Sequence, residues 1–462
     1  MVNFNLIRRV IPPIVALAMF MEALDSTILN TAIPVMSDSL KVNPINLKVA
    51  LISYLLSLAI FIPISGWCAD KWGIKKVFTA ALTIFTLSSL ACGFSSSVLM
   101  LVAARSVQGI GGAFMLPVGR LLVLRIFGRK EFVQVMNRIV IPALIGPALG
   151  PLLGGWISET WGWRWIFWVN IPLGLIAIAC AQLFLHEQRS QELPSFDGRG
   201  FLLFGLGVAG TAFGLSALSE DVFPYSLIAI LMAISISILC AYGWHAKYTP
   251  FPVVRIKLLT QRVLRISILG NILTRLGFGG LPFLLPLLLQ LVLNYSPKEA
   301  GAVVAFAAVG AMLLKTFSYR LLRRFGFKKL LLANTLMLGF TLWAFALVHQ
   351  GTPFYWVILL TLAYGVCSSL QFSTMNPLAY AETLPEDLSS VTSMLAVTQQ
   401  LAMSFGVAIS ALLLRSFAAL RQGQLLGLQD FQHSFMALGA ITIFASCIFY
   451  FLKHDDGKNL YH

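Results

Sequence analysis

The sequence predicts an all-α polytopic membrane protein, built as two six-helix bundles with two further helices inserted between them. Three observations predict this fold class. Of the 462 residues, 58% are apolar and only 11% are charged, whereas soluble domains carry about 45–50% apolar and about 25% charged residues. Fourteen apolar runs approach the roughly 20 residues that a spanning helix needs. An internal repeat relates the two ends of the chain.

The predicted spans follow the apolar runs, which are separated by charges or by clusters of Pro and Gly. The first six are expected near 10–34, 47–67, 77–95, 99–124, 132–157 and 165–185. The other eight are expected near 200–218, 224–244, 263–291, 299–318, 330–348, 353–377, 389–416 and 432–452. Runs that are continuously apolar exclude a transmembrane β-barrel, whose strands alternate. The short connections leave no room for a soluble catalytic domain.

The distribution of Lys and Arg predicts the orientation. With a cytoplasmic N-terminus, 22 of the 33 basic residues fall on the inner side and six on the outer side, and five lie within spans. This bias follows the positive-inside rule and places both termini in the cytoplasm. It also explains the net charge of +15 through the anionic inner leaflet, without a nucleic-acid partner.

The repeat joins two copies of one loop pattern. Both Gly66–Lys76 and Tyr319–Lys329 contain a basic residue, an aromatic residue, Gly, an apolar residue and Lys-Lys, at a constant offset of 253. The predicted domains are therefore an N-terminal six-span bundle (1–190), inserted spans 7 and 8 with their linkers (191–258), and a C-terminal six-span bundle (259–462). Paired repeats around a central site are typical of secondary transporters.

Two acids in the first span are the main candidates for chemistry. An acidic side chain near a helix centre costs about 2.5–3.5 kcal/mol to insert, so Asp25 and Glu22 call for a role. Their i, i+3 spacing puts them on one face, and hydrocarbon favours the protonated form of a carboxyl group. We predict that Asp25, and with it Glu22, carries protons. A permanent ion pair that fixes helix packing is the alternative.

Two further features of the first half suggest coupling and movement. Arg105 lies within span 4, where a cation near a carboxylate would help to eject its proton; backbone carbonyls could satisfy it instead. In span 5, glycines at i, i+4 and i+8 line one face for close helix contact, while prolines loosen the helix. These residues are Gly146, Pro147, Gly150, Pro151 and Gly154.

In the second half, Arg275 stands near the middle of span 9. No acid lies deep in spans 9–14, so its partner is expected to be an acid of the other half, the substrate or backbone. Other polar residues within spans are predicted to line a substrate cavity together with Arg275: Asn30, Gln108, Gln290, Gln371, Asn376 and Gln399.

Five motifs in order resemble the fourteen-span drug:proton antiporter branch of the major facilitator superfamily. They are L-D-S-T-I-L-N-T-A-I-P (24–34), G-W-C-A-D-K-W-G-I-K-K (66–76), R-S-V-Q-G-I-G-G-A (105–113), G-P-A-L-G-P-L-L-G-G (146–155) and W-R-W-I-F-W-V-N-I-P (163–172). The resemblance implies proton-driven export by alternating access, with Asp25 as an essential acid and Arg105 as its relay partner.

The resemblance also implies a gating role for the loop between spans 2 and 3 and for the span 5 motif. The loop residues are Gly66, Asp70, Gly73, Lys75 and Lys76, and Asp70 is expected to hold one conformation through Arg side chains and a helix end. Cys68 and Ile74 depart from the usual loop pattern, and Arg323 replaces Asp70 in the second copy. Glu22 is not part of the branch motif.

The sequence therefore predicts a proton-coupled exporter of small molecules in the inner membrane, a multidrug exporter in the first interpretation. Export of an organic anion, such as a metabolite or a metal chelator, is the alternative, and uptake by symport stays open. An enzyme is not expected, because no catalytic constellation or phosphate loop occurs. A channel is disfavoured by the two unequal halves. We expect a monomer without metal or cofactor, with substrate, protons and the lipid bilayer as its partners.

Overall fold

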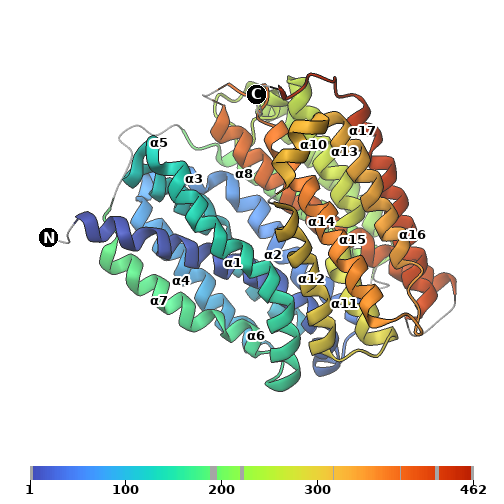
Figure 1. The fold of residues 1–462 in the computed structure, drawn as a ribbon. Helices are drawn as coiled ribbons and strands as arrows, with labels where there is room; N and C mark the ends of the chain where they lie inside the picture. Colours follow the sequence, from blue (N-terminus) through green and yellow to red (C-terminus); the bar gives the residue numbers. More distant parts are fainter. Residues whose placement is uncertain are drawn as a thin grey trace. The chain divides into compact units, whose positions relative to one another are not determined.

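The computed structural model describes residues 4–187, 195–218, 223–315, 317–384, 387–421 and 426–458. These residues form α-helices joined by short loops and short 3-10 or π turns, without any strand in the described ranges (Figure 1). The chain divides into two compact units, Met1–Gly198 and Arg199–His462. The predicted boundary at 190/191 lies outside the described residues, and the predicted three-part division stays a prediction.

The first unit is organised around one very long helix, α5. Its elements are α1 (Phe4–Leu40), η1 (Pro44–Leu47), α2 (Lys48–Phe61), η2 (Ile62–Ile64), α3 (Ser65–Trp72), α4 (Ile74–Gly93), α5 (Val98–Thr160), α6 (Trp165–Trp168) and α7 (Asn170–Phe184). Helix α5 packs against α1, α2 and α4, and α7 packs against α1 and α4. Figure 1 shows α1 running beside α5 and α7.

Glycines make the closest of these contacts possible. A Cβ atom on Gly146, Gly150 or Gly154 would overlap or crowd atoms of α1 between Ala23 and Thr31. The predicted span 5 glycine face is therefore a seam in which α5 touches α1 almost without intervening side chains. The hydroxyl of Thr31 also donates to the carbonyl oxygen of Pro151 at 3.2 Å, which ties the two helices across this seam.

The second unit contains the remaining helices. They are α8 (Gly198–Ala217), α9 (Tyr225–Tyr248), η3 (Ile256–Thr260), α10 (Arg262–Phe278), α11 (Leu281–Leu287), the π turn η4 (Leu288–Val292), α12 (Pro297–Lys315), α13 (Ser318–Phe345), α14 (Phe354–Leu378), α15 (Leu388–Leu420), α16 (Leu428–Ala445) and α17 (Cys447–Tyr450). Helix α10 packs against α15 and α16, and α14 packs against α12 and α13.

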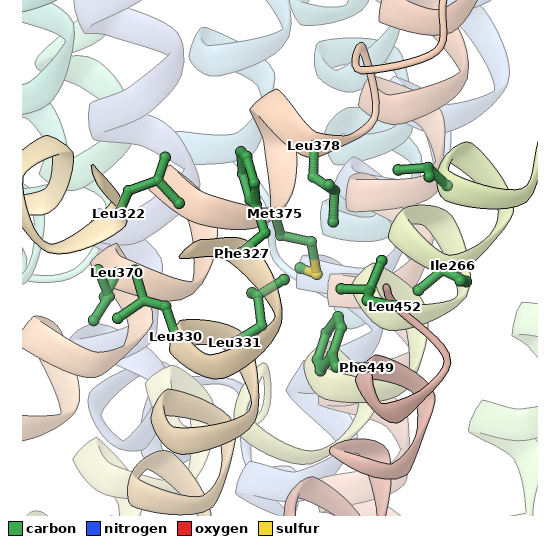
Figure 2. Packing of buried hydrophobic residues seen from close by; sticks show 11 residues of the cluster. Ile266, Leu322, Phe327, Leu330, Leu331, Leu370, Met375, Leu378, Phe449 and Leu452 are labelled. Atoms are coloured by element: carbon green, nitrogen blue, oxygen red, sulfur yellow. The ribbon is translucent and has the colours of Figure 1, made fainter. Parts of the chain in front are cut away.

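One end of this unit is held by a cluster of buried apolar side chains. Phe327 and Leu331 of α13 meet Met375 of α14 and Phe449 of α17 there (Figure 2). Each of these four side chains is at most 1% exposed. The cluster fixes the segment around the second loop motif against α10, α14 and α17.

The repeat predicted from the sequence is visible in the backbone. Gly73 follows α3 with φ 96°, and Gly326 interrupts α13 with φ 72°. These two glycines are 253 positions apart and occupy the same place in the two loop motifs. Because L side chains rarely adopt this left-handed conformation, glycine is required at both turns.

Twelve helical segments in the described residues are long and apolar enough to span a membrane. The chain is thus a multi-pass membrane protein, but the predicted number of fourteen spans is not confirmed. The two predicted spans without a counterpart, 132–157 and 330–348, fall in the distal parts of α5 and α13. Each part is helical and follows a glycine with positive φ, Gly128 or Gly326.

Candidate functional site

A closed polar cluster lies inside the first unit, around Asp25 of α1. The carboxylate of Asp25 forms an ion pair with Arg105 of α5, with 2.5 Å between Oδ2 and Nη1. Its other oxygen, Oδ1, accepts hydrogen bonds from the side-chain amides of Gln108 at 2.8 Å and Asn170 at 3.0 Å. All four side chains are at most 1% exposed.

Gln108 connects the members of this cluster. Its carbonyl oxygen accepts a hydrogen bond from Arg105 Nη1 at 2.8 Å, and its amide nitrogen also donates to Ser89 Oγ of α4 at 2.6 Å. The cluster therefore joins four helices, with Asp25 on α1, Ser89 on α4, Arg105 and Gln108 on α5, and Asn170 on α7. Helix positions that are distant in sequence are held together by one network of hydrogen bonds.

The guanidinium of Arg105 is enclosed on its remaining sides. Its Cζ atom lies 4.2 Å from the ring centroid of Tyr54, and its Nε donates to the carbonyl oxygen of Ala50 at 3.4 Å. Both of these residues belong to α2. Backbone therefore contributes to the environment of Arg105, but the ion pair with Asp25 is its principal contact.

In this geometry, protonation of Asp25 would require the side chains around it to rearrange. The carboxylate has opposite charge nearby and accepts three hydrogen bonds, so the cluster is neutral and its main acceptor is satisfied. A proton on Asp25 would remove the ion pair and leave Arg105 as an uncompensated buried cation. It would also turn one oxygen of Asp25 into a donor, so at least one of the present donors would have to move away.

The structure brings together some of the residues predicted from the sequence and leaves others apart. Asp25 and Arg105 meet as expected, and Gln108, predicted to line a substrate cavity, belongs to their network instead. Glu22 is half-buried and lies outside the cluster, as does the buried Asn30. The proton-coupling roles remain predictions.

Sequence reasoning missed two members of the cluster, Ser89 and Asn170. Asn170 lies in the span 6 motif W-R-W-I-F-W-V-N-I-P, where it is the one uncharged amide among apolar residues. That isolation was an available signal. Ser89 gave no comparable signal, because serines occur at many places in apolar helices.

In the second unit, Arg275 of α10 is 5% exposed and has a different environment. Its Nε donates to Asn271 Oδ1 at 3.0 Å, and its Cζ lies 4.0 Å from the ring centroid of Phe372. Within the described residues Arg275 has no acidic partner. A side-chain amide and an aromatic face, neither of which was predicted, hold this cation.

The other predicted cavity residues of this unit fall into two groups. Asn376 accepts hydrogen bonds from Asn271 and Gln399, so these amides continue the environment of Arg275. Gln371 is completely buried and accepts from Asn334 at 2.7 Å, which points to a role in packing α13 against α14. Gln290 is partly buried in the π turn η4.

The predicted gating loop lies between α3 and α4. Asp70 forms an ion pair with Arg125 of α5, with 2.5 Å between Oδ1 and Nη2 and with both side chains partly exposed. Lys75 donates to the carbonyl oxygen of Gln182 of α7 at 2.7 Å, and Lys76 is exposed. Gly66 has open space around it. The loop is thus linked to both α5 and α7, and its gating role stays a prediction.

Three comparisons with known proteins bear on this arrangement. The family model described as Major Facilitator Superfamily matches residues 15–251 and 267–460. The chain belongs to the Major Facilitator Superfamily. It is therefore a membrane transporter and not an enzyme, and the members of this family handle small-molecule substrates. In the described residues no cluster of His, Cys, Asp and Glu could hold a metal ion.

Relatives within this superfamily match almost the whole chain. A protein of Cronobacter sakazakii that is named a multidrug resistance protein, MdtD, is 37% identical over 455 residues, which are 96% of this chain and 95% of the relative. A protein of Haemophilus influenzae that is named a transport protein, HsrA, is 34% identical and covers 97% and 96%. These relatives support an MdtD-like drug transporter, in agreement with the resemblance to drug antiporters that the five motifs carry.

Solved structures support the fold independently. An auto-inhibited peptide transporter of the POT family has a TM-score of 0.74 with 19% identity, and covers 96% of both chains. A D-xylose-proton symporter has a TM-score of 0.70 with 13% identity, and covers 97% of this chain and 98% of its own. At such identities these likenesses show the superfamily fold alone.

Proposed function

We propose that this transporter is a proton-coupled exporter of small molecules across the inner membrane, working by alternating access. MdtD-type relatives that are named multidrug resistance proteins match almost the whole chain and favour a broad range of drugs as substrates. The bias of basic residues favours cytoplasmic termini. We further propose that the protein works as a monomer.

The proposed number of spans is fourteen. Helix α5 runs for 63 residues, which is too long for one span of about 20 residues. Its non-helical residue, Gly128, divides it into two segments that each reach the length of a span. Gly326 divides α13 into a short segment, 318–325, and a segment of nearly the length of a span, 327–345. The segments that follow Gly128 and Gly326 would be the two spans added to the twelve.

The observation that carries proton coupling is the sealed cluster around Asp25. The carboxylate of Asp25 is fully buried, and in the described part of the chain its ion pair is with Arg105. It can be ionised or protonated, and only the ionised form fits the present hydrogen bonds. Since the cluster joins α1, α4, α5 and α7, loading a proton favours another arrangement of these helices. Substrate release and proton release would then be coupled through one rearrangement of the first unit.

A second candidate function rests on Arg275. A buried cation in hydrocarbon is costly unless it is neutralised, and in the described residues Arg275 contacts an amide and an aromatic ring but no acidic side chain. The carboxylate of an organic anion would provide the missing charge. This observation favours export of an anionic metabolite or chelator over export of cationic drugs.

Reconstituted vesicles that contain the purified full chain test the proposal. We expect substrate efflux driven by a pH gradient in the wild type, and none in Asp25→Asn, while substrate counterflow, which needs no net proton movement, persists. Asp38→Asn serves as the matched control, because Asp38 is exposed near the end of the same helix. Undiminished proton-driven efflux by Asp25→Asn would refute the role of Asp25.

The same vesicles separate the two substrate classes. Cationic dyes and a panel of organic anions are offered in parallel to the wild type and to Arg275→Ala. If Arg275 binds substrate, anion efflux is lost and dye efflux is retained. Equal losses for both classes would count against Arg275 as a ligand, and efflux of anions alone by the wild type would overturn the multidrug assignment.

A further inference from the structure

A basic cavity of about 530 Å³ lies in the second unit, beside the end of α9. Its polar wall is formed by the end of α9 and by the connection to α10, and contains Lys247, Thr249, Arg255, Lys257, Thr260 and Gln261. The buried Tyr242 holds this connection in place. Its hydroxyl donates to Val254 O at 3.0 Å and accepts from Val254 N at 2.7 Å, so the chain is fastened to α9 at this point.

The charges of the cavity are unbalanced. Arg255 pairs with Asp387, with 3.1 Å between Nη1 and Oδ1. Lys247 and Lys257 are exposed and have no ion pair within the described residues. The positive charges of Lys247 and Lys257 therefore face the cavity without a negative partner among the described residues, and an anionic ligand would supply the missing negative charge.

Exposed aromatic side chains beside the cavity indicate its level in the membrane. Trp244 is 68% exposed, Tyr248 is 74% exposed and Phe251 is 49% exposed. Trp and Tyr gather where hydrocarbon meets the headgroup region. In the most apolar stretch of α9 only 17% of the residues are buried, so this helix is open to its surroundings. The cavity thus lies at the depth of lipid headgroups.

One hydrogen-bond acceptor in the wall of the cavity has no donor in the described part of the chain. Gln261 Oε1 is buried, and it has no hydrogen-bond partner among the described residues. Leaving a buried acceptor unsatisfied costs free energy. If the Gln261 side chain turns toward the cavity, its Oε1 can accept a hydrogen bond from a ligand hydroxyl, which favours a ligand with a hydroxyl donor as well as a negative charge.

We propose that this cavity binds the headgroup of an anionic phospholipid with a free hydroxyl, as in phosphatidylglycerol. Lys247 and Lys257 attract the phosphate, and Gln261 accepts a hydrogen bond from the glycerol hydroxyl. Apolar wall residues such as Leu258 and Pro252 lie beside the acyl chains. The bound lipid would join α9 to the connection that leads into α10, independently of transported substrate.

Native mass spectrometry of the purified, delipidated full chain tests this site. Phosphatidylglycerol is the probe, and phosphatidylethanol, phosphatidylethanolamine and soluble glycerol phosphate are its comparisons. We expect Lys247→Gln/Lys257→Gln to weaken phosphatidylglycerol binding by roughly 30-fold, from two headgroup charges removed. Lys329→Gln/Lys453→Gln removes equal charge elsewhere in the unit and should leave binding within about twofold.

The comparison lipids define what would overturn the proposal. We expect phosphatidylethanol, which has the same single negative charge but no headgroup hydroxyl, to bind more weakly than phosphatidylglycerol, and Gln261→Leu to abolish that difference while the protein keeps its thermal stability. Unchanged binding by the double lysine variant would refute the site. Equal binding of phosphatidylethanolamine would refute charge recognition, and equal binding of glycerol phosphate would show a soluble ligand in place of a lipid.

Discussion

The two halves of the molecule place different chemistry at equivalent positions. Asp25 of α1 corresponds to Phe278 of α10, 253 positions later. In the first unit the side chain of Gln108 donates to the carboxylate of Asp25. In the second unit the hydroxyl of Tyr364 donates to the backbone carbonyl oxygen of Phe278 at 3.1 Å. Helices α1 and α5 of the first unit are thus joined through an ionised side chain, whereas α10 and α14 of the second unit are joined through a backbone carbonyl group.

The surrounding scaffold is nevertheless repeated closely. Gly109 and Gly365, which are 256 positions apart, directly follow Gln108 and Tyr364. Gly109 allows close contact of α5 with α2, and Gly365 allows close contact of α14 with α12. A Cβ on Gly109 would crowd the carbonyl oxygen of Tyr54, and one on Gly365 would overlap that of Ala307, 253 positions after Tyr54. This glycine contact between two helices is therefore common to both halves, whereas the side chains at positions 25 and 278 differ.

The divergence separates charge between the halves. The first unit has a neutral, sealed ion pair, whereas the second has Arg275, which occupies the position equivalent to Glu22, 253 positions later. A neutral ion pair can change its charge by taking up a proton. An isolated arginine keeps its charge at any ordinary pH and suits the recognition of an anion. We infer that coupling belongs to the first half and substrate charge selection to the second.

The largest expected effect is the opposite response of the two buried arginines to removal. Arg105→Leu leaves the carboxylate of Asp25 buried without its partner, which should destabilise the protein by about 3–5 kcal/mol. Arg275→Leu removes an isolated cation from hydrocarbon and should leave stability unchanged or raise it. Thermal unfolding of the purified variants in detergent measures both.

A double variant controls for the Arg105 result. Asp25→Asn/Arg105→Leu removes both charges and should recover much of the stability that Arg105→Leu loses. Equal destabilisation by the two single arginine variants would contradict the contrast between the halves.

The second expected effect should be shared by both halves. Gly109→Ala and Gly365→Ala each insert a methyl group against backbone of the neighbouring helix, so each should cost about 1–3 kcal/mol or more. Gly365→Ala should be the worse, because its Cβ would overlap a carbonyl oxygen more deeply. Gly243→Ala is the control, since nothing lies within 4 Å of an added Cβ there. A harmless Gly365→Ala would contradict the shared scaffold.

Much of this scaffold could be predicted from the sequence. The apolar runs gave the helices, and the loop motifs gave a repeat whose two glycines, Gly73 and Gly326, both have positive φ. The pairing of Asp25 with Arg105 was implied by the resemblance of the span 1 and span 4 motifs to the antiporter branch. Such features are predictable because hydrocarbon penalises charges and because left-handed turns select glycine.

Other features could not be predicted, because they depend on how helices rotate against one another. Gln108 looked like a cavity residue, but its face of α5 turns toward Asp25. The expected partners of Arg275 were an acid, a substrate or backbone, whereas Asn271 and Phe372 hold it in the structure. Amides and aromatic rings are frequent in apolar helices, so their presence alone does not indicate which charge they contact.

The third expected effect is a difference in stability loss between removal of the Gln108 donor and removal of the Tyr364 donor. Gln108→Leu takes one donor from the Asp25 carboxylate and also removes the contact with Ser89, and should cost about 1–3 kcal/mol. Tyr364→Phe removes one hydrogen bond to the carbonyl oxygen of Phe278 and should cost about 1 kcal/mol. Chemical denaturation of both variants measures the difference. A larger loss in Tyr364→Phe would show that the second half depends more on its single hydrogen bond than the first half depends on Gln108.

The smallest expected effect concerns the loop motif, where Asp70 in one half corresponds to Arg323 in the other. The Asp70–Arg125 ion pair is partly exposed, so Asp70→Asn should cost at most about 1 kcal/mol, and less at high salt because the charges are screened. Arg323 is exposed, and Arg323→Gln should change stability by less than about 0.5 kcal/mol. If transport by Asp70→Asn falls far more than its stability, the ion pair acts on conformational exchange and not on folding. If transport and stability fall together, Asp70 only supports the structure, and the two halves differ in the Asp25 cluster but not in gating.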